Sequence, residues 1–356
     1  MRFNLTGKRI IRPPATSIEP TLPTKRAGLA ARPVLSGLPV LKNRGDGLSL
    51  GKLWTKRNTP LDGIGSPNVQ GMAASADRVI ATPNGGKVIY SSDGIVWSET
   101  ASVFSAAGPC AHGNGTFVTC EGSGGNSSAY TSTDGINWTT RTNAIPVAGN
   151  PRAAMAFGNG RFVVVGWQSD PNIGFCATSD DNGATWTQRT MPNGTWNDVV
   201  YGNGKFVAIA QNSFSQQFAY STDGASWSLA DTSGLGSVTG KAISYGMGKF
   251  VATNAGGNVR TSVDGINWSQ ASITGASPGN FHGKPIFGNG LCVIPSMSAA
   301  SPSKQVHSSD LTSFAVTDVT GPLPGVYKWG VFFKGLFVLG ENGGDPSENN
   351  VIHTAP

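Results

Sequence analysis

The chain has 356 residues, among them 49 glycines and 22 prolines, and only 13% of its residues are charged. Globular proteins average about 25% charged residues and about 7% glycine, so this composition excludes a protein built mainly from charged amphipathic helices. The net charge is +6. No stretch approaches the roughly 18 apolar residues of a membrane helix, so we expect no insertion into a membrane.

The first 45 residues hold the excess of positive charge. They contain nine basic residues and one acid, Glu19, which gives +8, whereas the rest of the chain has 17 basic and 19 acidic residues, or −2. Six prolines and the lack of a long hydrophobic period mean that this segment cannot bury enough surface to fold alone. We therefore predict two domains, an extended basic docking arm over residues 1–45 and a folded domain over residues 46–356.

Small apolar residues accompany the charges of the arm, a composition suited to docking as an extended strand on neighbouring subunits. The residues that we expect to dock are Arg2, Phe3, Lys8, Arg9, Ile10, Ile11 and Arg12. The same charge could bind the phosphates of a nucleic acid. Because Phe3 is the arm's only aromatic residue, nucleic acid is the less favoured partner. Charges and prolines interrupt the start of the chain, so we expect no secretory signal.

Beyond the arm, two short phrases recur at regular intervals. A strand with an aromatic residue near its start occurs seven times when degenerate copies are counted, at Trp54, Trp97, Trp138, Trp186, Trp227, Trp268 and Phe314. From Trp97 to Trp268 the spacings are 41, 48, 41 and 41 residues. A Gly-x-Gly phrase followed by an apolar strand also returns seven times, most clearly at residues 113–118, 158–163 and 202–207. A period of about 40–50 residues is typical of a β-propeller.

Each repeat contains four predicted strands. The fullest copy places them at residues 153–158, 162–167, 174–178 and 185–189, with Asn-Gly and Asp-Gly supplying the positive φ angles of short hairpin turns. Residues 53–57 match the fourth strand of a repeat, and residues 349–356 match a third strand with no fourth behind it. We therefore predict an all-β fold, a seven-bladed β-propeller of four-stranded antiparallel blades closed by N- and C-terminal strand exchange.

The turn before each tryptophan, as in Tyr90-Ser-Ser-Asp-Gly-Ile-Val-Trp97, resembles the Asp-box, or BNR repeat. This motif occurs in sialidases, sortilin-type receptors, some glucanases and photosystem-assembly propellers, and the resemblance covers about residues 50–356. We interpret its acids as structural, because a carboxylate there can accept backbone N–H bonds within its own turn. Turns on seven blade rims also cannot converge on one substrate. The structural acids are Asp93, Asp134, Asp181, Asp223 and Asp264.

A search for catalytic residues gives no complete set. The arginine triad of sialidases is missing, the four histidines are scattered, and no nucleophile, zinc or phosphate-loop motif occurs. Four cysteines lack CxxC spacing, and Cys176 and Cys292 fall in apolar strands as predicted buried thiols. We predict no catalytic residue, no metal and no cofactor. A sialidase-like or other glycan-active enzyme remains an alternative, as does a propeller scaffold or assembly factor.

One pattern indicates binding. Polar and aromatic residues lie three to five positions before the aromatic residue that precedes each Gly-x-Gly turn, where the innermost strands would open toward the central funnel. A ring of cations and aromatics suits sugars or acidic groups, although strand starts can also be polar merely because they are solvated. We predict a ligand funnel for a glycan or anionic surface receptor, formed by Arg152, Trp196, Asn197, Lys241, His282, Lys284, Lys328 and Trp329, with Asp198 and Tyr327 at neighbouring positions.

A basic docking arm on a compact propeller resembles the organisation of a structural protein of a tailed bacteriophage. This resemblance is one of organisation and not of motif. It implies a non-enzymatic virion protein, made in the host cytoplasm, with other virion subunits as partners in a symmetric assembly. The propeller would then serve as a capsid or tail decoration, a fibre or a receptor-binding head for host attachment. A photosystem-assembly propeller would instead be expected to carry an export signal.

Overall fold

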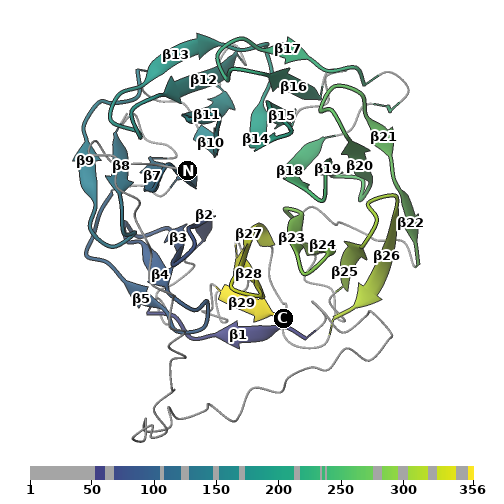
Figure 1. The fold of residues 1–356 in the computed structure, drawn as a ribbon, viewed down its shortest axis with the longest axis horizontal. Coiled ribbons are helices and arrows are strands. Elements are labelled where there is room, and N and C mark those ends of the chain that lie inside the picture. Colours follow the sequence, from purple (N-terminus) through teal and green to yellow (C-terminus); the bar gives the residue numbers. More distant parts are fainter. Residues whose placement is uncertain are drawn as a thin grey trace, which may run out of the picture. The chain divides into compact units, whose positions relative to one another are not determined.

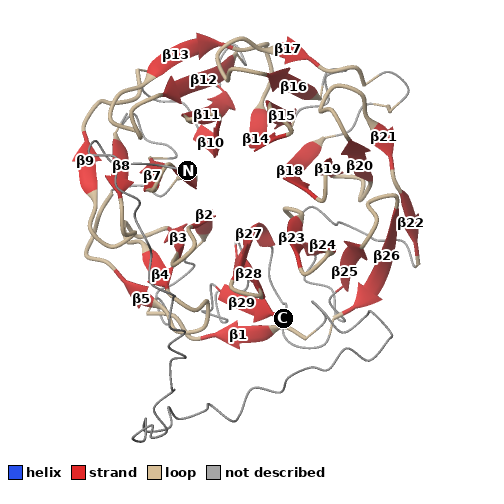
Figure 2. Cartoon of the chain, in the orientation of Figure 1, coloured by secondary structure: helices blue, strands red, loops and turns tan. Residues whose placement is uncertain are grey.

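The computed structural model describes residues 53–60, 68–104, 108–121, 128–146, 152–167, 173–211, 217–232, 235–236, 239–275, 283–295, 304–319, 327–341 and 352–356. All regular structure within these residues is β-strand (Figure 2). Contacts divide the chain into two units, Met1–Asp46 and Gly47–Pro356. The docking-arm residues predicted from the sequence lie outside the described residues, and so does His282.

Seven antiparallel blades form a ring, which confirms the predicted β-propeller (Figure 1). We number the blades in chain order, and the first strand of each lies nearest the axis of the ring. Blades 1 to 3 contain β2 (Val69–Ala74), β3 (Val79–Pro83), β4 (Ile89–Ser91), β5 (Ser98–Glu99), β6 (Cys110–Gly113), β7 (Thr116–Cys120), β8 (Ala129–Ser132), β9 (Thr139–Arg141), β10 (Arg152–Gly158), β11 (Arg161–Trp167), β12 (Gly174–Ser179) and β13 (Thr187–Thr190).

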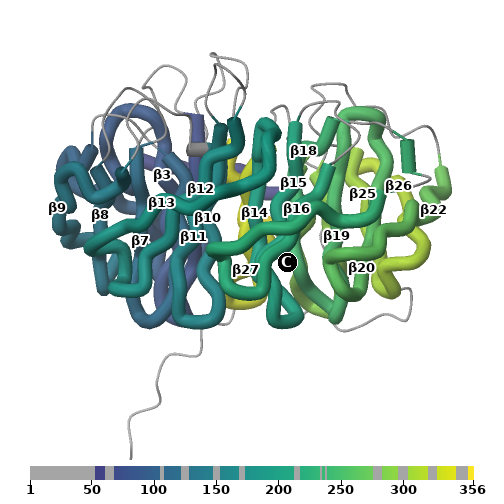
Figure 3. The backbone as a smooth tube through the Cα atoms, turned by 90° about the horizontal axis from the view of Figure 1, so that it is seen from above, coloured from purple at the N-terminus to yellow at the C-terminus, as the bar shows by residue number. Residues whose placement is uncertain are grey.

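The second half of the ring repeats this order from the axis outward. Blades 4 and 5 contain β14 (Trp196–Gly202), β15 (Lys205–Ala210), β16 (Phe218–Ser221), β17 (Ser228–Leu229), β18 (Gly240–Gly246), β19 (Lys249–Asn254), β20 (Val259–Ser262) and β21 (Ser269–Gln270). Blades 6 and 7 contain β23 (Ile286–Gly288), β24 (Leu291–Pro295), β25 (Lys304–Ser308), β26 (Ser313–Asp318), β27 (Tyr327–Phe333), β28 (Leu336–Glu341), β29 (Ile352–Ala355) and β1 (Thr55–Arg57). Seen from the side, the strands run between two ends of the ring, with the Gly-x-Gly turns at one of them (Figure 3).

The ends of the chain close the ring as predicted. β1 pairs with β29 in antiparallel fashion, with Thr55 opposite Thr354 and Arg57 opposite Ile352. The Arg57 Nε donates to the Thr354 hydroxyl over 2.7 Å. Trp54, only 2% exposed, donates its indole N–H to Gln305 Oε1 of blade 6 over 3.0 Å. Blade 7 therefore consists of three strands from the end of the chain and one from its beginning.

Blade 6 departs from the four-stranded repeat. A short strand, β22 (Ser272–Thr274), pairs in parallel with β26 and adds a fifth strand at the outer edge. It follows the last strand of blade 5 directly, so the chain runs along the rim of the next blade before it turns inward. The chain leaves blade 4 in a similar way. Asp231, just after β17, donates its N–H to Ile266 O in the rim turn of blade 5 over 3.1 Å.

The core consists of apolar residues between neighbouring blades, and the second strand of each blade is buried along most of its length. β11, for example, buries Phe162, Val163, Val164 and Val165 completely. Strands buried on both faces read as continuous apolar runs because each face packs against another sheet. All four cysteines are free and buried, which confirms the buried thiols predicted at Cys176 and Cys292.

Candidate functional site

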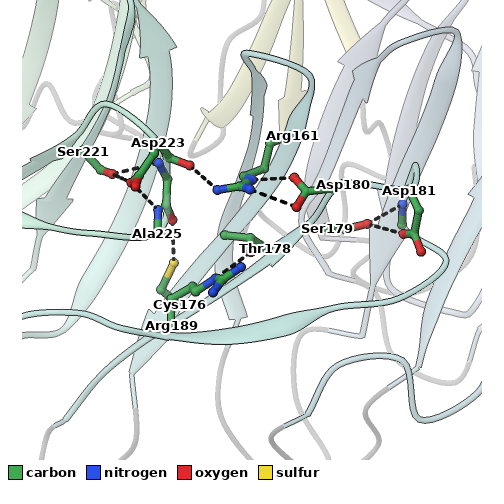
Figure 4. Close-up of polar contacts among 12 residues, drawn as sticks. Arg161, Cys176, Thr178, Ser179, Asp180, Asp181, Arg189, Ser221, Asp223 and Ala225 are labelled. Atoms are coloured by element: carbon green, nitrogen blue, oxygen red, sulfur yellow. Dashed lines mark hydrogen bonds and ion pairs between the residues drawn. The ribbon is translucent and has the colours of Figure 1, made fainter.

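Six blades carry a turn between their third and fourth strands that is built around one serine and one aspartate. In blade 4 the Ser221 hydroxyl donates to Asp223 Oδ1 over 2.9 Å and accepts the N–H of Gly224 over 2.8 Å (Figure 4). The same carboxylate oxygen accepts the N–H groups of Ala225 and Ser226, each over 2.8 Å. The Trp227 indole donates to Gly224 O over 3.2 Å. These polar groups bond one another, which assigns them to the turn itself.

The turn holds its carboxylate in the charged form. Backbone N–H donors, that of Ser226 foremost, lower the pKa of Asp223 to about 2. Burial alone would raise the pKa of Asp264, but the N–H groups of Asn267 and Ile266 lower it to about 2. Asp310 in blade 6 forms the same turn with Ser308. It was not among the predicted structural acids, and its repeat has Leu311 and Phe314 where the others have glycine and tryptophan.

The turns of adjacent blades are also bonded to each other. Arg161 donates to both carboxylate oxygens of Asp180 over 2.5 and 2.9 Å, and to the backbone oxygen of Asp223 in blade 4 over 2.5 Å (Figure 4). Asn203 Nδ2 donates to Val263 O over 2.9 Å, and Lys334 Nζ donates to Ser92 O over 2.8 Å, each across a blade boundary. The turn end of the ring therefore uses these polar groups for its own assembly.

At the opposite end of the ring, several innermost strands begin with an irregularity in strand pairing. β10, β14, β18 and β27 each start with a β-bulge, where two residues oppose one on the neighbouring strand. The extra residues are Ala153, Asn197, Lys241 and Lys328. A bulge redirects side chains and interrupts strand pairing, and bulges are frequent next to functional sites. Three of these four extra residues belong to the predicted funnel.

A single buried carboxylate connects three blades at this end. Asp198, which is 1% exposed, accepts the N–H of Val199 and, from blade 5, the N–H of Ile243, each over 2.9 Å. Lys284, just before β23 of blade 6, donates to both of its oxygens over 2.7 and 2.6 Å. Asn197 Nδ2 adds a bond of 2.5 Å to Lys241 O. Blades 4, 5 and 6 are thus linked through adjacent residues of β14.

Two lysines approach an aromatic ring beside this carboxylate. Nζ of Lys328 lies 5.2 Å from the centroid of the Trp329 ring, and Nζ of Lys284 lies 5.5 Å from it. Burial lowers the pKa of Lys328, and the positive charges of Lys284 and Lys241 lower it further, while Asp198 acts in the opposite direction. We call Lys241, Lys284, Lys328, Trp329 and Asp198 the axial cluster.

The structure brings some of the predicted funnel residues together and buries one of them elsewhere. Lys241, Lys284, Lys328 and Trp329 belong to the axial cluster, and Asn197 supports it. Trp196 does not line the funnel: it is fully buried in the core, and its indole N–H donates to Pro192 O over 2.8 Å.

Two more of the predicted funnel residues cannot be placed in the same way. Arg152 is the first residue of β10, but its side chain is not among the described parts of the structure. The whole of His282 lies outside the described residues. Asp198 was not among the predicted funnel residues, although it lies at a neighbouring position in the sequence. Its signal was a lone acid among lysines at equivalent strand starts.

The described residues contain no group of three or more His, Cys, Asp or Glu side chains arranged for a metal ion. Nor does any helix long and apolar enough to cross a membrane occur in that part of the chain.

Comparison with known proteins identifies the fold. No protein-family model matches the chain, and no curated protein sequence matches it. Among solved structures, YCF48 bound to D1 peptide is similar with a TM-score of 0.60 at 13% identity, over 85% of this chain and 96% of that chain. YCF48 from Cyanidioschyzon merolae gives 0.59 at 13% identity, over 85% and 98%. The WD40 beta propeller domain of Doa1 gives 0.60 at 11% identity, over 86% and 97%. At sequence identities of 11 to 13%, the similarity shows a common fold and nothing further.

Proposed function

We propose that the chain is a non-enzymatic binding protein whose propeller holds a partner protein at the end of the ring that carries the axial cluster. The observation that carries this proposal is the cluster itself, in which Lys284 of blade 6 bonds the buried carboxylate of Asp198 and Lys328 of blade 7 lies over the ring of Trp329. A propeller of similar fold, YCF48, has been solved with a bound peptide. Propellers are well suited to this role because many loops surround one axis.

An enzyme is the less favoured function. Glycoside hydrolysis ordinarily uses two carboxyl groups on either side of the scissile bond. Among the described residues that begin the innermost strands, Asp198 is the one carboxylate, and both of its oxygens already accept hydrogen bonds. In this proposal the aspartates of the rim turns belong to Asp-box repeats that serve the blades and bind no ligand.

We further propose that the partner belongs to the particle of a tailed bacteriophage, with residues 1–45 as the anchor and the propeller as a decoration or receptor-binding head. The support is the division of charge, because residues 1–45 carry +8 and the rest of the chain carries −2. A strongly basic, proline-rich segment gains order only against another surface. The chain would then be a virion component in a symmetric assembly.

Cross-linking of intact particles tests both parts of the proposal. An amine-reactive cross-linker followed by mass spectrometry should join Lys241 or Lys328, and lysines of residues 1–45, to other subunits. Lys205 and Lys249, which lie beside the Gly-x-Gly turns at the other end of β15 and β19, are matched controls and should link rarely. Particles that lack the chain would contradict the virion assignment. Links confined to the turn end would contradict the binding face.

A further inference from the structure

The charges of the axial cluster do not balance. Three lysines and one aspartate give +2, and the aspartate is fully engaged by Lys284. The ion pairs formed among the described residues include Lys284 with Asp198, but neither Lys241 nor Lys328. Lysines in a partly buried site repel one another unless an anion lies nearby. Two cations of the cluster are therefore available to a ligand.

The cluster is held in place before any ligand arrives. Asp198 fixes Lys284 and the backbone of Ile243, and Asn197 fixes the carbonyl of Lys241. Lys328 is the extra residue of the bulge that starts β27, and its ammonium group stays over the ring of Trp329. A preorganised site loses less conformational freedom on binding, which favours affinity and selectivity.

Trp329 supplies a second observation that indicates a ligand. The residue is 93% buried, yet its indole N–H has no hydrogen-bond acceptor among the described residues. Buried indole groups ordinarily find an acceptor. The tryptophans of the rim turns do so, as Trp97 shows by donating to Gly94 O over 3.2 Å. The acceptor for the Trp329 indole therefore comes from outside the described residues, and the two neighbouring lysines favour an acceptor that carries negative charge.

Asp198 shows how this cluster binds a carboxylate, with one lysine and two backbone N–H groups at 2.6 to 2.9 Å. We infer that Lys241, Lys328 and Trp329 form a carboxylate-binding site for an acidic segment of a partner protein. This inference rests on the proposed function and names the chemistry of its partner.

Short synthetic peptides test the inference on the full-length chain. A fluorescein-labelled peptide of six glutamates should bind, as measured by fluorescence anisotropy. A matched peptide of six glutamines should bind at least about tenfold more weakly, because hydrogen bonds to charged groups are the stronger ones. Affinity for the glutamate peptide should fall as salt rises from about 50 to about 300 mM, since screening weakens exposed charges most. Equal affinity for the two peptides would overturn the inference.

Lysine variants locate the binding. Lys241→Met and Lys328→Met keep the apolar stem and remove the charge, and each should weaken the glutamate peptide about tenfold. Lys249→Met is the control, because Lys249 lies in the same blade as Lys241 at the other end of the hairpin of β18 and β19. A loss of the same size in Lys249→Met would place binding elsewhere and overturn the inference.

Measurements on the wild-type chain avoid any dependence on variant folding. In a nitrogen-15 NMR spectrum, the indole resonance of Trp329, assigned with Trp329→Phe, should shift on addition of the glutamate peptide. Inorganic phosphate or sulfate that displaces the peptide at equal concentration would identify a general anion site and overturn the choice of an acidic peptide. If peptides fail while particle cross-links at Lys241 or Lys328 persist, the carboxylate inference falls and the proposed function stands.

Discussion

The two glycines of each Gly-x-Gly turn have different physical roles, as the turn of blade 3 shows. Asn159 and Gly160 take left-handed conformations, with φ of 49° and 75°, whereas a Cβ on Gly158 would lie 2.0 Å from Cγ of Tyr201 in blade 4. The first glycine is therefore required by packing between blades. The same approach recurs for the pairs Gly113 and Phe157, Gly202 and Tyr245, Gly246 and Phe287, and Gly288 and Phe332.

At the boundary between blades 7 and 1 the large and the small side chain of this contact change places. Phe333 occupies the position of the first glycine, and Ala74 occupies that of the aromatic residue, as the strand registers show. Both belong to one hydrophobic cluster. Exchanges that keep total volume are the ones that cores tolerate best. The repeats looked degenerate in the sequence at this point because periodicity describes positions within a blade and gives no information on contacts between blades.

The first prediction concerns Gly158. Replacing it by alanine should destabilise the protein by about 1–3 kcal/mol, the range for overpacking a core, because the methyl group enters the space of the Tyr201 ring. The measurement is urea unfolding. In a Tyr201→Ala background the cost of Gly158→Ala should largely disappear, because the ring is gone.

Gly160→Ala is the matched control for this prediction. It should cost about 1 kcal/mol because of its positive φ, and this cost should be the same with or without the ring of Tyr201. Equal costs of Gly158→Ala in both backgrounds would contradict the packing explanation.

A second residue-scale prediction follows from the rim turns. The pKa of Asp223 is lowered from its ordinary value of 3.8 to about 2. The unfolded chain therefore takes up the proton first, and the stability that Asp223 contributes above about pH 4 is lost as the pH falls toward 2. Asp223→Asn should be less stable than wild type at pH 7, and the two should converge near pH 2 in thermal unfolding. A constant difference over this range would exclude a role for the charge.

At the scale of elements, most strands could be predicted and their irregularities could not. Strands predicted at 153–158 and 162–167 match β10 and β11 to within one residue, and β13 starts two residues later than predicted because Trp186 still belongs to the turn. β22 was not predicted, because three residues are too short a run to establish an alternating pattern.

The candidate site shows the same limit. The lysines were visible as a pattern at equivalent strand starts, but the bulges and the bonds of Asp198 depend on strand register, which the sequence pattern leaves open.

β29, the last strand, gives the third prediction. Burial lowers the pKa of His353 from its ordinary value of 6.5 to about 4, and the charge of Lys56 on β1 contributes to this lowering. The neutral ring contacts the Tyr327 hydroxyl over 3.3 Å. Since the unfolded chain is protonated first, the stability present above pH 6.5 should fall by up to about 3 kcal/mol as the pH drops to 4. His353→Gln does not titrate, so its urea midpoint should vary less between pH 7 and pH 4. An unchanged profile would exclude His353 as the cause.

At the scale of the whole molecule, stability depends on one non-covalent closure. The other blades join their third and fourth strands by a turn, whereas blade 7 joins β29 to β1 only by pairing and by side chains. Trp54 takes the place of a rim-turn tryptophan, and Gln305 of blade 6 supplies the acceptor that the missing turn glycine cannot. Replacing Trp54 by alanine should cost about 3–5 kcal/mol, as for other buried aromatic residues.

The last prediction uses this closure directly. Removing residues 1–44 should leave the thermal midpoint nearly unchanged, because β1 and Trp54 remain. Removing residues 1–60 deletes both, leaves the edge of β29 unpaired, and should lower the midpoint strongly. A synthetic peptide of residues 50–60 should then bind the shortened chain and restore its midpoint, because an extended segment can complete a sheet through main-chain hydrogen bonds. A peptide with Trp54→Ala is the control and should restore little. If the shortened chain melts like wild type, or if both peptides act equally, strand exchange is not what closes the ring.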